Sequence, residues 1–135
     1  MESLPVFVYG TLKAHEARAH KWPRIPLRIE PAVVRGALYD LGPYPALTDG
    51  DDSVLGELWH MAAGHMEETI AALDQIECFG VDEVDLYVRR VVPVTLANGA
   101  VHQAYSYLIA DPASLSRAKR IKPNGAGYCI WSGRL

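Results

Sequence analysis

Features that would assign the 135-residue sequence to a specialised class of proteins are scarce. Its two cysteines, Cys78 and Cys129, form no metal-type pair, and we expect both to be reduced thiols. No apolar run is long enough to span a bilayer, and residues 1–9 lack the positive charge and long apolar stretch of a secretory signal. A cytoplasmic protein without a membrane partner is therefore the default expectation.

Basic residues are also fewer than acidic residues in this sequence. The chain has 13 lysine and arginine residues against 16 aspartate and glutamate residues, which gives a net charge of −3. Its densest basic stretch, residues 117–122, is short and is typical of a solvated loop or helix face. A nucleic-acid partner needs a concentrated basic face, so none is expected here.

The histidines and glycines form no recognisable metal or cofactor motif. His15 and His20 are five positions apart, as are His60 and His65, whereas a helical zinc site needs a spacing of four. Neither a GxGxxG fingerprint nor a Walker-type phosphate loop is present. We therefore expect no cofactor.

Half of the residues are apolar, which is enough to bury a core, and the length fits one domain over residues 1–135. Apolar patterning predicts strands at residues 6–9, 33–41, 54–60, 87–96 and 101–109. Turns are predicted at residues 42–45, 49–52 and 97–99, and prolines between residues 23 and 31 exclude a long helix. Residues 13–22 are expected to form a loop with one helical turn, and the tail after residue 110 to be irregular.

Glycines in two predicted strands bear on the shape of the sheet. Gly36 and Gly56 each lie near the middle of a strand, which indicates a bend or a close approach of two backbones. The pattern as a whole predicts one α+β domain with a mixed, mostly antiparallel sheet that is closed or strongly curved.

One helix is predicted clearly, at residues 64–77. Met66, Ile70 and Leu73 recur at helical spacing and form an apolar stripe. Glu67 and Glu68 fall in the first turn, where the helix dipole favours acidic side chains.

Glu77 stands out at the end of this helix. It comes seven residues after Ile70, and at about 100° per residue this places it within roughly 20° of the apolar stripe. Burial and the negative end of the helix dipole both raise the pKa of a carboxyl, which suits acid–base catalysis. The alternative is an ordinary helix end, with Glu77 exposed or paired with Arg89 or Arg90.

A second candidate is the segment Tyr9, Gly10, Thr11 and Leu12, named here the 9–12 loop. A glycine just beyond a strand lets backbone N–H groups face an anion or a carbonyl, although a simple strand-to-loop turn fits the same residues. Tyrosines form a third group, because their hydroxyls can bind a carboxylate or position an acid, although an aromatic core explains them equally. These are Tyr39, Tyr44, Tyr87, Tyr105 and Tyr107.

Several blocks of the sequence resemble the γ-glutamyl cyclotransferase-like superfamily, which includes γ-glutamylamine cyclotransferases and plant avirulence-induced proteins. The blocks occur in the family order: VFVYGTLK at residues 6–13, GALYDLGPYPAL at 36–47, GELW at 56–59, LDQIE at 73–77 and YVRR at 87–90. Together they cover the chain from residue 6 to about residue 107 and form a specific set.

The resemblance implies a small mixed β-barrel with flanking helices and no cofactor. It implies that the 9–12 loop cradles the carboxylate and carbonyl of the glutamyl or oxoproline group, that Glu77 is the general acid–base, and that Tyr44 and Tyr87 line the pocket. The implied reaction closes a γ-glutamyl group into 5-oxoproline and expels an amine. The expected partner is a small γ-glutamyl molecule, with the protein a monomer or weak homodimer.

Two departures from the family pattern lead to a preference and an alternative. Cys78 replaces the usual glycine after the glutamate, and residues 80–86 are acidic. An acidic mouth would disfavour anionic substrates, so we expect a γ-glutamylamine or another neutral-to-cationic leaving group. The alternative function is a non-catalytic module that keeps the same pocket and binds a small molecule.

Overall fold

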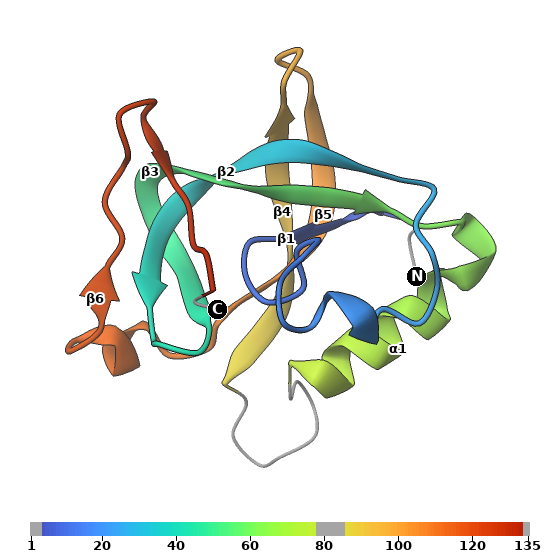
Figure 1. The fold of residues 1–135 in the computed structure, drawn as a ribbon, viewed down its shortest axis with the longest axis horizontal. Helices are drawn as coiled ribbons and strands as arrows, with labels where there is room; N and C mark the ends of the chain where they lie inside the picture. Colours follow the sequence, from blue (N-terminus) through green and yellow to red (C-terminus); the bar gives the residue numbers. More distant parts are fainter. Residues whose placement is uncertain (1–3, 78–85, 134–135) are drawn as a thin grey trace.

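The computed structural model describes residues 4–77 and 86–133, arranged as in Figure 1. The strands are β1 (Val6–Val8), β2 (Arg28–Asp40), β3 (Pro45–His60), β4 (Tyr87–Leu96), β5 (Val101–Ile109), β6 (Lys119–Arg120) and β7 (Tyr128–Cys129). The helices of the described residues are α1 (Met66–Ile76) and the short 3₁₀ turns η1 (Ala19–Lys21), η2 (Ala63–His65) and η3 (Pro112–Leu115). The expected α+β class is confirmed. None of these helices is long and apolar enough to cross a membrane.

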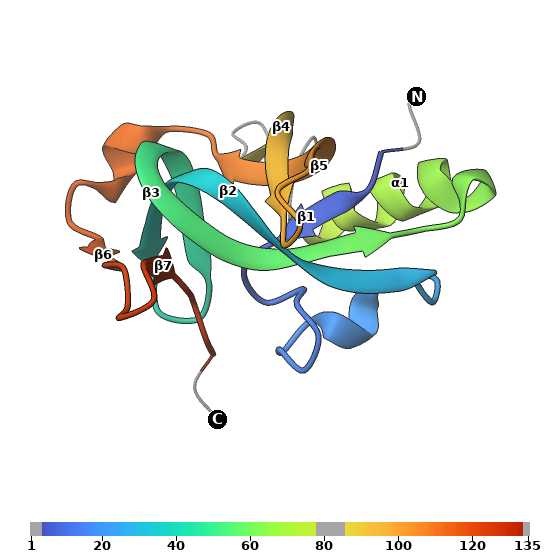
Figure 2. The same cartoon turned by 90° about the horizontal axis from the view of Figure 1, so that it is seen from above.

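Five strands close into a barrel. They are hydrogen-bonded in the order β2, β4, β5, β1 and β3, and β3 pairs back with β2 to complete the ring. The β1–β5 pair is parallel, and the other four pairs of the ring are antiparallel. Figure 2 shows α1 and the β6–β7 segment at opposite ends of the molecule. The predicted closed, mostly antiparallel barrel is therefore confirmed.

The hairpin loop predicted at residues 49–52 is wrong, because residues 45–60 form the single strand β3. The pairing of β3 with β2 shifts between Gly36 and Ala37, which leaves residues 49–51 as an irregular insertion within the strand. Small and acidic residues there produce a bulge instead of a chain reversal. The reversal occurs at residues 41–44, one residue earlier than the predicted turn at residues 42–45, and the Leu41 amide donates to the Tyr44 carbonyl at 3.0 Å.

Strand β2 begins five residues earlier than predicted, at Arg28, and contains Pro31. Proline has no N–H to donate, so it is tolerated only where one side of the strand is not paired. The pairing of β2 with β4 involves Ala32 and Val33, and Pro31 lies just outside it. The strand therefore extends through a residue that, in the sequence alone, indicates a break.

Helix α1 forms as its apolar spacing predicts. Met66, Ile70 and Leu73 are buried, whereas Glu67 in the first turn is exposed. The helix ends at Ile76, and Glu77 is its C-terminal cap. The Glu77 amide donates to the Leu73 carbonyl at 2.9 Å, which fixes the backbone of the last turn.

The core has two parts that share strand β1. Val6 and Val8 face α1 and pack with Ile70 and other residues of one cluster. Phe7, on the opposite face of the strand, packs in the barrel interior with residues such as Leu58. Because side chains alternate along a strand, β1 serves both layers, and its C-terminal end lies where they meet.

The predicted bend or close backbone approach is confirmed at both glycines, Gly36 and Gly56. A Cβ atom at Gly36 would lie 2.8 Å from the Thr48 carbonyl oxygen, and the approach at Gly56 is closer still. A Cβ atom at Gly56 would lie 2.4 Å from the Val8 carbonyl oxygen and 2.7 Å from the Phe7 ring.

We expect Gly56→Ala to lower the free energy of unfolding by about 1–3 kcal/mol, the range typical of overpacked cores. Urea unfolding measures the change. Gly64→Ala is the control, since nothing lies within 4 Å of its Cβ position, and an equal effect in both variants would contradict the prediction.

Candidate active site

A cavity of about 190 Å³ lies between the end of β1 and the end of α1. Its lining residues are Phe7, Val8, Tyr9, Gly10, Thr11, Leu12, Arg18, Tyr44, Pro45, Ile76, Glu77, Leu86, Tyr87 and Tyr107. All seven residues singled out in the sequence as site residues are among them. The structure thus brings together a loop, two tyrosines and a glutamate that are separated by up to 78 positions in the chain.

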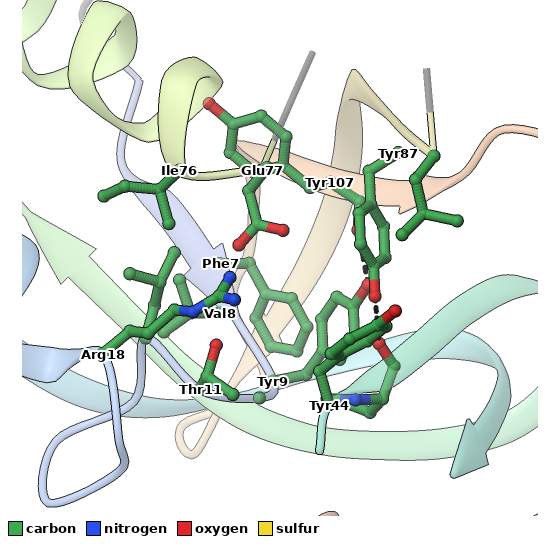
Figure 3. Close-up of a pocket in the computed structure, with 14 residues that line it drawn as sticks. Phe7, Val8, Tyr9, Thr11, Arg18, Tyr44, Ile76, Glu77, Tyr87 and Tyr107 are labelled. Atoms are coloured by element: carbon green, nitrogen blue, oxygen red, sulfur yellow. Dashed lines mark hydrogen bonds between the residues drawn. The ribbon is translucent and has the colours of Figure 1, made fainter. Parts of the chain in front are cut away.

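The carboxyl of Glu77 points into this cavity, toward Arg18 (Figure 3). Burial raises the pKa of the Glu77 carboxyl to about 7, while the positive charge of Arg18 opposes that rise. A carboxyl with this pKa exchanges protons readily at neutral pH. The alternative of an ordinary helix end, with Glu77 exposed or paired with Arg89 or Arg90, is not what the structure shows, because Glu77 lines the cavity and the charged group that acts on its carboxyl is Arg18.

The 9–12 loop forms the side of the cavity opposite α1. Its Gly10 is needed for close approach, because a Cβ atom there would lie 2.6 Å from a Pro45 ring carbon. The Gly10 and Thr11 carbonyls accept hydrogen bonds from the Lys13 and Arg18 amides at 3.0 and 2.8 Å. Within residues 4–77 and 86–133, the amides of residues 10–12 have no protein acceptor. They remain able to bind an oxygen atom of a ligand.

Two of the pocket tyrosines use their hydroxyls to hold the backbone. Tyr9 donates to the Tyr107 carbonyl at 2.5 Å, and Tyr87 donates to the Pro45 carbonyl at 2.6 Å. Burial raises the pKa of both hydroxyls, so both are neutral at physiological pH. The Tyr44 ring packs edge-on against Tyr87, with 6.3 Å between ring centroids. Tyr9 and Tyr87 therefore shape the wall, and their hydroxyl protons are already engaged.

Tyr107 connects the pocket wall to the helix that carries Glu77. Its hydroxyl donates to Oδ1 of Asp74 at 2.6 Å, and Arg89 donates to Oδ2 of the same carboxylate. Asp74 lies one helical turn before Glu77, so these bonds fix the last turn of α1 against β4 and β5. Tyr105 faces the same side of β5 and belongs to the core cluster, and Tyr39 packs at its edge. For these two tyrosines the aromatic-core interpretation holds.

Arg18 is a lining residue that sequence reasoning missed. It follows a polar stretch without periodicity, and only tertiary contacts bring it to the cavity. The loop that carries it is held by Glu57, whose Oε1 accepts the Ala14 amide at 2.8 Å, and by Trp22, whose indole N–H donates to the Leu12 carbonyl at 2.9 Å. The Trp22 ring in turn stacks on Trp59 at 4.1 Å. A loop anchored at this many points keeps the Arg18 backbone in place.

Other residues noted in the sequence lie outside the cavity or outside the described part of the chain. Cys78 and the acidic residues Asp82, Glu83 and Asp85 are among the residues that the structure does not describe. Cys129 is a buried free thiol. In the described ranges, no three His, Cys, Asp or Glu side chains are placed to share a metal ion.

Residues 6–128 match the family described as gamma-glutamyl cyclotransferase, AIG2-like. A Vibrio cholerae protein named "Putative gamma-glutamylcyclotransferase" is 40% identical over 76 residues, which are 53% of this chain and 60% of that protein.

Two solved structures resemble the fold. One is YkqA from Bacillus subtilis, with a TM-score of 0.63, 24% identity, and coverage of 89% of this chain and 38% of the other. The second is a protein named "Gamma-glutamyl cyclotransferase", with a TM-score of 0.57, 20% identity, and coverage of 93% of this chain and 74% of the other. At these identities the structural likeness concerns the fold alone.

Proposed function

Because the chain belongs to the gamma-glutamyl cyclotransferase, AIG2-like family, we propose that it releases 5-oxoproline and a free amine from a γ-glutamyl amine or related γ-glutamyl amide. The observation that carries this proposal is the position of the Glu77 carboxyl, which faces the 9–12 loop across one cavity. Glu77 is proposed as the general acid–base. The 9–12 loop, Tyr44 and Tyr87 are proposed to bind the substrate.

The reaction requires proton transfer in both directions. The α-ammonium of the γ-glutamyl group must lose a proton before its nitrogen can attack the γ-carbonyl carbon. A C–N bond then forms to close the five-membered ring, and the C–N bond to the leaving amine breaks. Two of the three ammonium protons end on the leaving amine and the third stays on the ring nitrogen. Glu77, with a pKa of about 7, is suited to take up each proton and return it.

The remaining contributions come from binding and geometry. The attack is intramolecular, so the substrate itself supplies much of the proximity that an enzyme otherwise provides. Negative charge develops on the γ-carbonyl oxygen during attack, and the amides of residues 10–12 are available to stabilise it. The preference for a neutral or cationic leaving group depends on the acidic sequence of residues 80–86 alone.

The direct test is turnover of a panel of γ-glutamyl compounds. Purified protein is incubated with γ-glutamyl-lysine, γ-glutamyl-alanine and glutathione, and 5-oxoproline is measured by mass spectrometry. We expect release from the first two, with glutathione the poorest substrate. Binding detected by thermal shift without release from any compound would contradict the enzymatic proposal and favour the non-catalytic binding module.

A further inference from the structure

Among the described residues, one acidic and one basic side chain, Glu77 and Arg18, line the cavity, and the pair complements the ammonium and carboxylate groups of an amino acid. We propose that Arg18 binds the α-carboxylate of the γ-glutamyl group and so restricts the enzyme to substrates in which that carboxylate is free. This inference rests on the proposed function, since it assigns the orientation of the γ-glutamyl group in the same site.

Arg18 is the basic member of the described residues that line the cavity. Its guanidinium projects toward the Glu77 carboxyl (Figure 3), and its positive charge acts to lower the pKa of that carboxyl. In the described part of the chain it makes no ion pair, whereas several other arginines do: Arg24, Arg28, Arg89, Arg90 and Arg120 each lie within 4.0 Å of a carboxylate. The Arg18 charge is therefore available for a ligand.

The nearby lysine is already engaged elsewhere. Lys13 lies in the same loop, but its Nζ donates to the Trp131 carbonyl at 2.6 Å, and it does not line the cavity. Burial lowers the pKa of the Lys13 ammonium, which reflects this enclosed position. Among the described basic residues, Arg18 is therefore the one that is placed to bind a carboxylate inside the cavity.

The chemistry of the substrate determines where its carboxylate must lie. The α-ammonium and the α-carboxylate are bonded to the same carbon atom. If Glu77 accepts a proton from the ammonium, the carboxylate lies close to Glu77 as well, where the Arg18 guanidinium, which projects toward the Glu77 carboxyl, can reach it. A carboxylate placed in a partly apolar cavity without a partner would be costly, and a guanidinium can bind both of its oxygens at once.

This assignment also defines which substrate group the amides of the 9–12 loop bind. The resemblance to known cyclotransferases implies a loop that cradles both the carboxylate and the carbonyl. With the carboxylate on Arg18, the amides of residues 10–12 are left for the γ-carbonyl oxygen, where negative charge develops during attack. The Glu77 carboxyl, the Arg18 guanidinium and the loop amides then contact three different groups of one substrate.

The test compares two ligands that differ only in the carboxylate. 5-Oxoproline carries it, and 2-pyrrolidinone is the same ring without it. We expect Arg18→Met to weaken binding of 5-oxoproline by about 10- to 100-fold, the value of a charged hydrogen-bonded pair, and to leave binding of 2-pyrrolidinone unchanged. Arg18→Lys should fall between wild type and Arg18→Met, and the exposed Arg35→Met is the matched control. Calorimetry or ligand-detected NMR measures both ligands.

Turnover adds a readout that is independent of product binding. Arg18→Met should raise KM for a γ-glutamyl amine, while wild type and variant should process the corresponding 4-aminobutyryl amide, which lacks the carboxylate, at equal kcat/KM. Equal loss for both ligands would assign Arg18 a structural role, and unchanged binding of 5-oxoproline would overturn the inference. Wild-type binding of 5-oxoproline without turnover would contradict the proposed reaction and leave the Arg18 test intact.

Discussion

Glu77→Gln is expected to reduce the rate of 5-oxoproline release by about 10²- to 10⁴-fold, the contribution typical of a general acid–base. Glutamine is close to glutamate in size but cannot take up or return a proton. The hydrogen bond from the Glu77 amide to the Leu73 carbonyl joins backbone atoms only, so the end of α1 should keep its shape in the variant. The decrease should therefore appear in kcat, with binding of 5-oxoproline largely retained.

The pH dependence of kcat/KM provides a second test of Glu77 as the acid–base. Glu77 acts as a base only when it is ionised, and its pKa is about 7, so kcat/KM of the wild type should fall as the pH is lowered through 7. Glu67→Gln is the control, because Glu67 is an exposed glutamate in the first turn of the same helix. If Glu77→Gln turns over substrate at the rate of the Glu67 variant, Glu77 is not the acid–base.

The same substitution is expected to stabilise the protein at alkaline pH. The pKa of Glu77 in the folded state is about 7, above the value of 4.5 that a free glutamate has. The folded state thus binds the proton more tightly than the unfolded chain does. Its contribution to stability is complete below pH 4.5 and is lost as the pH rises through 7.

The size of this effect follows from the shift in pKa. A difference of about 2.5 pKa units corresponds to at most about 3 kcal/mol in the free energy of unfolding. The wild type loses this contribution as the pH rises from acidic values to above 7. Glutamine is neutral at every pH, so Glu77→Gln should match the wild type near pH 4 and exceed its free energy of unfolding near pH 8. Urea unfolding at both pH values measures the difference. If the free energy of unfolding of Glu77→Gln differs from that of the wild type by the same amount at pH 4 and at pH 8, the carboxyl is not buried in the folded protein.

The two predictions with Glu77→Gln point in opposite directions, as is common for catalytic groups held in an unfavourable environment. Activity should be lost while stability is gained. A variant that loses both would indicate a folding defect, and the pair of measurements separates that outcome from loss of the acid–base.

The orientation of Glu77 could be predicted because helical periodicity is a local property. Met66, Ile70 and Leu73 define the buried stripe of α1, and the position of Glu77 relative to them follows from 100° per residue. The hairpin between β4 and β5 was predictable for a similar reason, since Gly99 adopts a positive φ of 85° that its turn requires. In both cases the deciding interactions lie within a few residues of each other.

Features that depend on distant contacts could not be predicted. Arg18 reaches the cavity because Glu57 and Trp22 hold its loop, and no spacing in residues 13–22 reveals those partners. The tail was expected to be irregular, yet it contains η3 and the short strands β6 and β7, which pair with the distant strands β2 and β3. Residues 49–51 have the composition of a turn, and they lie within a strand only because the residues on both sides of them, Thr48 and Asp52, pair with β2.

The hydroxyl of Tyr9 has a consequence for how the substrate range of this barrel can change. It donates a hydrogen bond to the Tyr107 carbonyl of β5 and accepts one from the Leu47 amide of β3, so this part of the cavity wall also cross-links two strands. A substitution of Tyr9 would therefore destabilise the barrel at the same time as it changed the shape of the pocket. New leaving groups are therefore expected to be accommodated at the rim of the cavity, where Leu86 is 41% exposed.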